Sequence, residues 1–331
     1  MAELARLSRR SMLGLGAAAG LYGLSGLASP VLAKAPFLNT QAPTFFRFKL
    51  GSAEATIISD GVLPLGDPHA AFLGISASDL DSMLTNNFLP VGAATLEQNI
   101  LVLNTGDKII IFDNGMGVSK LFGDTTGKML MTLKLAGIDA KDVDALVMTH
   151  AHIDHCGGVI GPDGKPSFPN AELFISEADF TFWTDEAKVG PTYKAFYEQA
   201  VRNLLPVKDR ITFLKDGQEF LPGVQAMFTP GHTVGHTIFL IQSGKDQLAY
   251  IGDISHHPVL LIERPLIEFA YDTDPKQAAK TRVRVLDMLA ANRTRILGYH
   301  FPWPGIGHIG KLGDGFRYYP TAVHTMDVAP I

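Results

Sequence analysis

Four side chains able to bind a metal ion stand within six residues of this chain: His150, His152, Asp154 and His155. They follow Ala145–Met148, an apolar run that is short enough for a buried strand. Because side chains alternate along an extended backbone, His150 and His152 can point the same way at the strand end. A lone His-x-His pattern is also typical of an exposed cluster or an adventitious site. The full His-x-His-x-Asp-His pattern behind a strand predicts a built metal site, since zinc binds imidazole and carboxylate readily.

Three further polar residues stand just behind apolar runs later in the chain. They are His232 after Val224–Phe228, Asp253 after Gln247–Ile251 and His300 after Arg295–Leu297. Taken singly, each residue is as compatible with a core or capping role as with a ligand. Because sites on sheets gather side chains from strand ends, we expect these three to join the first four.

The remaining pattern mixes short strands with helices in each half of the chain, which predicts an α/β protein with sheets covered by helices. Expected strands include the hairpins Phe45–Leu50 with Ala53–Ser59 and Asn99–Leu103 with Lys108–Phe112, and also Glu172–Ile175 and Thr237–Gln242. Expected helices are Met129–Ala136, Tyr193–Leu204, one starting at Ser76, one opening at Ser176 and one from Asp274-Pro275 to Asn292. No linker divides residues 36–331, so we expect one catalytic domain.

Residues 1–35 have the features of a signal peptide. Arg6, Arg9 and Arg10 give a basic start, residues 11–33 carry no charge, and Ala33-Lys34-Ala35 offers a small-residue cleavage site. The segment around Arg9-Arg10 resembles a twin-arginine export signal. A retained membrane anchor is the alternative, because the uncharged stretch is long enough to span a bilayer. Its Gly, Ser and Pro interruptions favour cleavage, and we expect a periplasmic protein without stable membrane association.

The charge balance is that of an ordinary soluble surface. There are 28 basic and 33 acidic residues, and no basic stripe that would indicate nucleic-acid binding. Cys156 is the single cysteine, which excludes an intrachain disulfide. The expected partner is a small-molecule substrate, and the sequence leaves a homodimer open.

The motif His150–His155, followed in this order by His232, Asp253 and His300, resembles the metallo-β-lactamase superfamily. The resemblance extends from about Phe45 to Tyr319 and implies a four-layer αββα sandwich made of two similar halves. It implies a first metal ion on His150, His152 and His232, a second on Asp154, His155 and His300, and Asp253 as the bridge between them. Zinc is the expected metal for both positions, although manganese, iron and cobalt suit similar ligands.

Other segments resemble the methyl parathion hydrolase group, which has lactonase-like members. They are Ser59-Asp60-Gly61, Phe112-Asp113-Asn114-Gly115 and Phe301–Ile309, with Trp303 as an insertion behind His300. The expected reaction is hydrolysis of an ester, lactone or phosphotriester by a hydroxide that bridges two metal ions, which lower the pKa of water towards neutrality. Asp154 and Asp253 are the expected catalytic carboxylates.

Three alternatives stay open at this point. A β-lactamase fits the export signal but not the segment behind His300, and a thioesterase of the glyoxalase II type fits the motif but not export. A non-hydrolytic metal-binding or redox protein fits less well, because di-iron relatives usually depart from the histidine motif and carry a flavin domain.

Several other residues have weaker signals. Asp113 is expected to accept a hydrogen bond from a ligand histidine, with a plain turn residue as the alternative. We expect structural or surface roles for His236, His256, His257 and His308, because the seven-ligand set is full, and a small buried role for Cys156. The aromatic cluster Phe180, Phe182, Trp183, Phe196 and Tyr197 predicts core packing or an apolar wall for the leaving group.

Overall fold

The structure is a computed structural model that describes residues 45–323. The predicted signal peptide lies outside the described residues, so export to the periplasm stays a prediction, as does a homodimer. Within residues 45–323, none of the helices combines the length and the apolar character needed to cross a bilayer.

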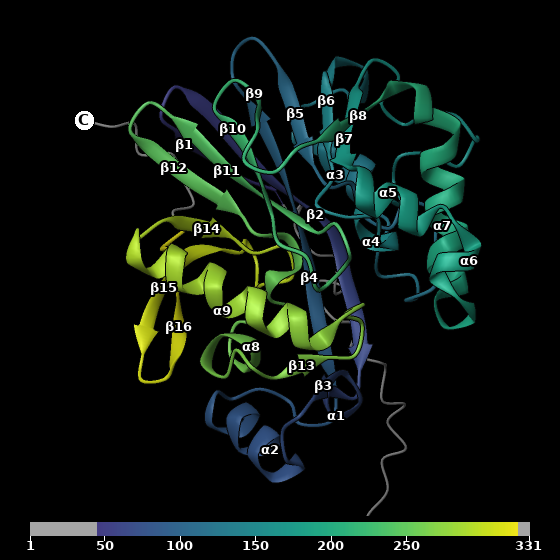
Figure 1. Ribbon diagram of the computed structural model, residues 1–331. Helices are drawn as coiled ribbons and strands as arrows, with labels where there is room; N and C mark the ends of the chain where they lie inside the picture. The colour runs from purple at the N-terminus through teal and green to yellow at the C-terminus, as the bar shows by residue number, and fades with distance from the viewer. Residues whose placement is uncertain (1–44, 324–331) are drawn as a thin grey trace, which may run out of the picture. The chain divides into compact units, whose positions relative to one another are not determined.

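Two seven-stranded sheets form the centre of the described part (Figure 1). The first has the strand order β1-β2-β4-β5-β6-β7-β8. Its strands are β1 (Phe45–Leu50), β2 (Ala53–Gly66), β4 (Ala94–Asn104), β5 (Ile109–Phe112), β6 (Ala145–Val147), β7 (Glu172–Ser176) and β8 (Ile211–Leu214). The strands from β1 to β5 pair antiparallel, whereas those from β5 to β8 pair parallel.

The predicted hairpins are present, but two of their strands are longer than predicted. β2 continues past Ser59 to Gly66, and β4 begins at Ala94 instead of Asn99. Asp60-Gly61 forms a bulge inside β2, because the register against β4 shifts between Ser59 and Val62.

The second sheet has the order β16-β15-β14-β12-β11-β10-β9. Its strands are β9 (Glu219–Leu221), β10 (Val224–Phe228), β11 (Thr237–Ser243), β12 (Asp246–Tyr250), β14 (Arg295–Leu297), β15 (Ile306–Leu312) and β16 (Gly315–Pro320). β10 and β12 are both antiparallel to β11, and β12 is parallel to β14. Therefore β10, β12 and β14 all run in one direction. A small sheet joins β3 (Phe72–Leu73) to β13 (Glu268–Phe269).

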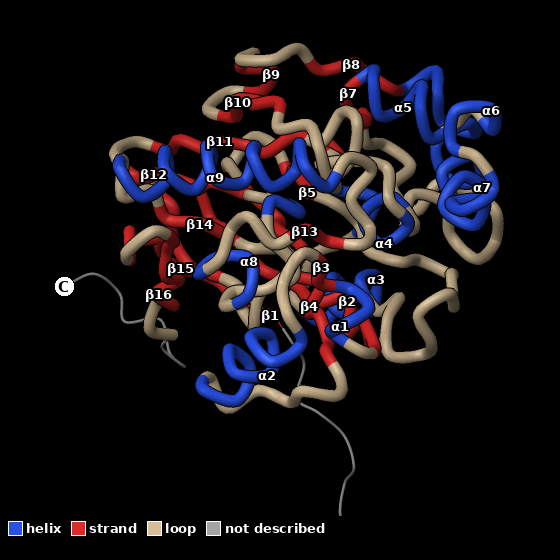
Figure 2. The backbone as a smooth tube through the Cα atoms, turned by 60° about the horizontal axis from the view of Figure 1, so that its bottom comes forward, coloured by secondary structure: helices blue, strands red, loops and turns tan. Residues whose placement is uncertain are grey.

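Some helices cover the outer faces of the two sheets, and others pack in a separate cluster around the small sheet. They are α1 (Pro68–Ala71), α2 (Ala77–Asn86), α3 (Met129–Leu135), α4 (Ile153–Cys156), α5 (Glu177–Trp183), α6 (Glu186–Val189), α7 (Lys194–Leu204), α8 (Leu260–Glu263) and α9 (Pro275–Ala291). The predicted helix starts are confirmed, since Ser76, Ser176 and Asp274 each accept a backbone N–H three residues later. In Figures 1 and 2, α5, α6 and α7 lie beside the first sheet and α9 lies along the second.

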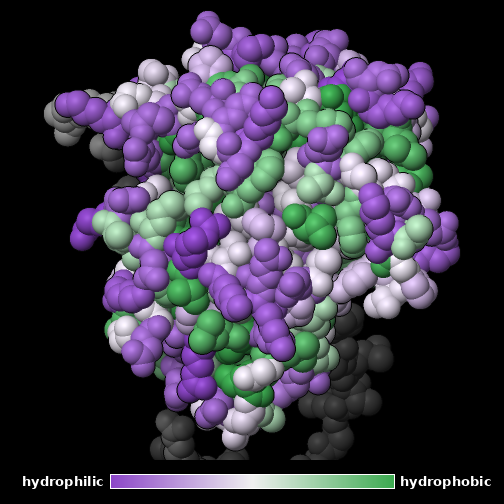
Figure 3. All heavy atoms as spheres, in the orientation of Figure 1, coloured by the Kyte–Doolittle hydropathy of each residue, from purple (hydrophilic) through white to green (hydrophobic). Residues whose placement is uncertain are grey.

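Apolar side chains hold these layers together. Between the sheets, the ring of Phe112 lies 5.6 Å from the rings of Phe239 and Tyr250. A separate cluster joins α9, through Val285 and Leu286, to the opposite face of the second sheet. Hydrophilic side chains cover much of the outer face drawn in Figure 3, and hydrophobic ones show near α2 and α8. The order helices, sheet, sheet, helices confirms the predicted four-layer sandwich.

Candidate metal centre

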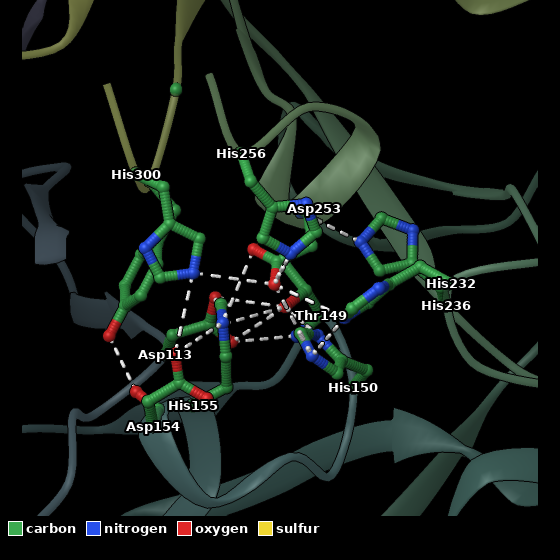
Figure 4. Close-up of polar contacts among 12 residues, drawn as sticks. Asp113, Thr149, His150, Asp154, His155, His232, His236, Asp253, His256 and His300 are labelled. Atoms are coloured by element: carbon green, nitrogen blue, oxygen red, sulfur yellow. Dashed lines mark hydrogen bonds and ion pairs between the residues drawn. The ribbon is translucent and has the colours of Figure 1, made fainter. Parts of the chain in front are cut away.

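The seven predicted ligands meet where strands of both sheets end. Figure 4 labels six of them, all except His152. His150 and His152 follow β6, and His232, Asp253 and His300 follow β10, β12 and β14. Because β10, β12 and β14 run in one direction, their carboxyl ends lie at one edge of the second sheet. The Thr237 N–H donates to the Thr149 carbonyl (2.9 Å), which joins this edge to the first sheet.

Two sets of three ligand atoms can be distinguished. Atoms of His150, His152 and His232 lie within 4.8 Å of one another, and so do atoms of Asp154, His155 and His300. The Asp253 carboxylate lies between the sets: Oδ2 is 3.2 Å from His232 Nε2 and 3.4 Å from His300 Nε2, and Oδ1 is 3.2 Å from His155 Nε2. This is the grouping that the family resemblance implies, and the binding of two ions to it remains a prediction.

The chemistry of the donor atoms fits divalent cations. All seven residues are buried, and Nε2 of His152 has no hydrogen-bond partner, whereas Nε2 of His155 and Oδ1 of Asp253 face each other at 3.2 Å without a hydrogen bond. A buried polar atom without a partner costs about 1–3 kcal/mol. Coordination of a zinc-like ion by imidazole nitrogen and carboxylate oxygen would remove that cost.

Outer hydrogen bonds orient three of the ligand imidazoles. Nδ1 of His155 donates to Asp113 Oδ2, Nδ1 of His232 donates to Asp272 Oδ1, and Nδ1 of His300 donates to the Glu97 carbonyl, each at 2.8 Å. When Nδ1 carries the proton, Nε2 keeps a lone pair for the centre. The predicted hydrogen bond from a ligand histidine to Asp113 is therefore confirmed.

Buried aspartates also hold the backbone around the ligands. Asp113 accepts the Thr149 N–H (2.8 Å) just before His150, and its positive φ of 60° is one that aspartate tolerates. Asp179, on α5, accepts the N–H groups of Ala151 (2.7 Å) and Gly235 (2.8 Å). It thus ties together the two ligand segments that follow β6 and β10. Sequence analysis missed this role, and the single signal was the position of Asp179 in the Ser176 cap.

His256 departs from the predicted structural or surface role. Its Nε2 lies 2.9 Å from Asp253 Oδ2, and with His232 and Asp253 it forms a further group close enough to share an ion. Its ring stacks on Phe269 with centroids 3.9 Å apart. The sequence does not predict this contact, because the seven expected metal ligands already form a complete set.

The other three histidines fit the predicted roles. His236 Nε2 accepts the Asp253 N–H (3.0 Å), so it fixes the backbone of a predicted ligand. His257 Nδ1 accepts the N–H groups of Val259 and Leu260, and His308 is exposed on β15.

Cys156 and the aromatic cluster divide between packing and the site. Cys156 is fully buried, as predicted. Trp183 is buried with its ring 4.7 Å from His152, whereas Phe180, Phe182 and Tyr197 pack against the core from partly buried positions. Of the five predicted aromatic residues, Phe196 is the one that lines the cleft above the ligands.

That cleft, counted together with the solvent space at its mouth, has a volume of about 330 Å³. Its floor contains the polar side chains His152, Asp154, His232, Asp253, His256 and His300. Its walls are apolar and aromatic: Leu63, Leu65, Leu96, Phe122, Phe196, Phe269 and Tyr271. Polar groups converging at the bottom of an apolar cleft are typical of a small-molecule site.

Burial and neighbouring carboxylates shift the pKa values of the ligand histidines in opposite directions. Burial lowers the pKa of His150 and His152 well below the ordinary value, so both imidazoles are neutral, as metal binding requires. Burial also lowers the pKa of His232 and His300, but neighbouring carboxylates outweigh this effect and raise both values to about 9. In the absence of a cation, these protons offset the buried carboxylates.

Comparison with known proteins places this geometry in a wider group. The family model described as the metallo-beta-lactamase superfamily matches residues 94–300. A crystal structure of AidC, a dizinc quorum-quenching lactonase in complex with an N-acyl homoserine product, is 30% identical, with a TM-score of 0.80 over 85% of this chain and 98% of that one.

Curated relatives are more distant. An N-acyl homoserine lactonase of Bacillus cereus is 22% identical over 46% of this chain and 65% of its own length. The transcription termination factor FttA of Methanocaldococcus jannaschii is 25% identical over 71% of this chain and 42% of its own. The chain thus spans less than two thirds of the length of these relatives.

We predict that metal ions stabilise the protein more strongly at alkaline pH. The folded-state pKa values of His232 and His300 are raised to about 9, so the stabilisation from their protons is complete below about pH 6.5 and is lost as the pH rises through 9. Bound cations would keep the carboxylates compensated over the same range. The difference in Tm between zinc-loaded and chelator-treated protein should therefore widen from pH 6.5 to 9.5. A constant difference in calorimetric scans would contradict this prediction.

Asp113→Asn should weaken metal binding and retain the fold. The neutral amide accepts the His155 Nδ1–H less strongly, and loss of such an outer contact lowers metal affinity by roughly 10–100-fold. Zinc affinity is measured by competition with a chromophoric chelator. Asp144→Asn is the matched control, because Asp144 accepts the Ile109 N–H (2.7 Å) away from the ligands. Equal zinc affinities for both variants would exclude the role assigned to Asp113.

Proposed function

The chain belongs to the metallo-β-lactamase superfamily, and from this premise we propose that it is a dinuclear metal-dependent hydrolase that opens lactones carrying an apolar acyl group. The observation that carries the proposal is the cleft: two ligand sets form its floor, and apolar side chains form its walls. The solved structure of AidC, a dizinc lactonase at 30% identity, supports the lactone class.

Two bound divalent cations would supply the charge that activates water near neutral pH and polarises a carbonyl oxygen. The chain's own groups hold the reactants and move the proton. Asp154 is 7% exposed, the largest value among the seven residues, so its carboxylate can reach a substrate in the cleft. We assign Asp154 to accept the proton of the attacking water and return it to the leaving alkoxide. Its backbone is held by the Tyr299 hydroxyl, which donates to the Asp154 carbonyl (2.6 Å).

Asp253 has a different role because it is nearly inaccessible. Its carboxylate faces both ligand sets, its N–H is held by His236, and His256 contacts Oδ2. Asp253 would therefore set the separation of the two ions instead of contacting the substrate. A fixed separation of about 3.5–4 Å is what a two-metal site needs to act on one bond.

The walls of the cleft bear on substrate choice. Leucine, phenylalanine and tyrosine side chains line them, with neither a lysine nor an arginine among the lining residues of the described cleft. This lining suits an alkyl acyl chain and, as the second candidate, the aryl group of a phosphotriester. A net charge of −5 does not favour an RNA strand as the substrate.

Zinc-loaded protein should hydrolyse N-hexanoyl-homoserine lactone or dihydrocoumarin in preference to an aryl phosphotriester, a cephalosporin or a glutathione thioester. The apolar walls and the named relatives underlie this expectation. Initial rates on the five substrates are measured with about two equivalents of zinc and again after chelation. Full activity in metal-depleted protein would sink the proposal, and preference for the cephalosporin, the thioester or the phosphotriester would replace the lactone assignment.

His152→Ala and Asp253→Ala should each abolish turnover, because each removes a predicted ligand. The loss should exceed the roughly 100-fold that an outer contact contributes. Zinc content and circular dichroism show whether the folded protein has lost its ions. His308→Ala is the control, since His308 is exposed on β15 outside the cleft lining. Retention of two ions and full turnover in the Asp253 variant would contradict the assigned ligand set.

A further inference from the structure

Strand β2 has its bulge at Ser59-Asp60-Gly61, a segment without a role in the proposed reaction. Ser59 pairs with Asn99 and Val62 pairs with Glu97, so Asp60 and Gly61 together face Gln98. Gly61 has a φ of +106°, which a residue with a side chain rarely adopts. Bulges interrupt the alternation of a strand and redirect its side chains, and this one turns Asp60 into the interior, where it is fully buried.

The buried carboxylate of Asp60 accepts hydrogen bonds from both ends of one long segment. Oδ2 accepts the N–H groups of Met116 (2.8 Å) and Gly127 (3.0 Å), and Oδ1 accepts that of Met129 (2.7 Å). The last bond caps α3, because Lys128, which precedes the helix, makes no side-chain cap of its own. Burial raises the pKa of Asp60 to about 6, while the N–H donors act in the opposite direction.

The first residues of this segment pack closely against α4, the helix that contains Asp154 and His155. A Cβ on Gly117 would lie 2.0 Å from the Gly157 carbonyl oxygen, and one on Gly115 would lie 2.3 Å from the Asp60 carboxyl carbon. The Asn114 N–H also donates to the His155 carbonyl (2.9 Å). The segment therefore fills the space between the bulge and α4, which contains these two predicted ligands.

The middle of the segment contributes a side chain, Phe122, to the wall of the cleft. Phe122 is half-buried, lines the cleft, and has its ring 6.3 Å from that of Tyr271, another lining residue. Residues 113–128 contain neither helix nor strand, so no ladder of backbone hydrogen bonds places Phe122. Its position depends on where the segment is tied down, and Asp60 ties it at three points.

We propose that Asp60 is a positioning residue that determines which acyl chains the cleft accepts, by holding residues 116–129 and through them Phe122. The inference rests on the proposed lactone hydrolysis for its substrate and on the hydrogen bonds of Asp60 for its mechanism. The ligands themselves have separate anchors in Asp113, Asp179 and Asp272. Loosening the 116–129 segment should therefore alter the wall more than the floor.

Asp60→Asn changes the hydrogen bonds that residue 60 accepts, with little change in side-chain volume. An amide presents one oxygen, so one or more of the three N–H groups loses its acceptor, and the segment relaxes away from the bulge. A long acyl chain that packs on Phe122 should then bind less well. A short acyl group that does not reach Phe122 should be unaffected.

The test is a double-mutant cycle on zinc-loaded full-length protein, with N-acetyl- and N-hexanoyl-homoserine lactone as substrates. Asp60→Asn and Phe122→Ala should each raise KM for the hexanoyl substrate roughly tenfold. KM for the acetyl substrate and kcat for both should stay within about twofold. The double variant should resemble Phe122→Ala alone, because residues that act through one another do not add. Asp144→Asn is the matched control and should leave all of these values unchanged.

Two outcomes of the cycle would overturn the proposal. The first is that the two substitutions add, and the second is that Asp60→Asn changes KM equally for both substrates. Hydrogen exchange tests, without any substrate, whether Asp60 holds residues 116–129 in place. Amides of residues 116–129 should exchange faster in Asp60→Asn and not in Asp144→Asn, and unchanged exchange would also overturn the proposal. If the wild-type protein opened neither lactone, the proposed function would be wrong. The exchange result would then be the test of whether Asp60 holds residues 116–129.

Discussion

The charge of two buried carboxylates is the constraint on which the rest of this structure depends. Asp154 and Asp253 lie among five imidazoles in an interior where an uncompensated ion costs several kcal/mol. In the metal-free protein, imidazolium protons supply the compensation, which is why the pKa values of His232 and His300 are raised to about 9. Divalent ions would supply it through coordination, and they would also give a partner to Nε2 of His152, which makes no hydrogen bond.

A second set of buried aspartates keeps this arrangement in place. Asp113 and Asp179 each accept two N–H groups that belong to, or stand next to, a predicted ligand, and Asp272 accepts one from the His232 ring. The ligands follow strand ends and lie in turns or in very short helices, where the backbone has no strand ladder of hydrogen bonds to fix it. A carboxylate that receives two or more N–H donors supplies that rigidity from a neighbouring element. These hydrogen bonds hold the backbone and the rings of the predicted ligands in fixed positions.

The sequence predicted the ligands well because their signal is local. His150, His152 and the strand before them are adjacent, and the two-residue period of a strand shows where each side chain points. Asp60 contacts Met116 across 56 residues of the chain, and Asp179 contacts Ala151 and Gly235 across 28 and 56 residues, and a sequence does not display such contacts. His256 was missed for a related reason: only the fold shows that it stacks on Phe269 beside Asp253.

The walls of the cleft were the least predictable feature, and the reason again lies at Asp60. The strand that begins at Ala53 was expected to end at Ser59, before Asp60-Gly61. Because the pair forms a bulge instead, the strand continues to Leu63 and Leu65, which become one wall of the cleft. The same bulge turns the Asp60 carboxylate towards the segment that carries Phe122, another wall. Floor and walls thus come from different parts of the chain, the floor from strand ends and the walls from a bulged strand and a clamped segment. A protein built this way can change its substrate at the walls while the charge balance of the floor stays intact.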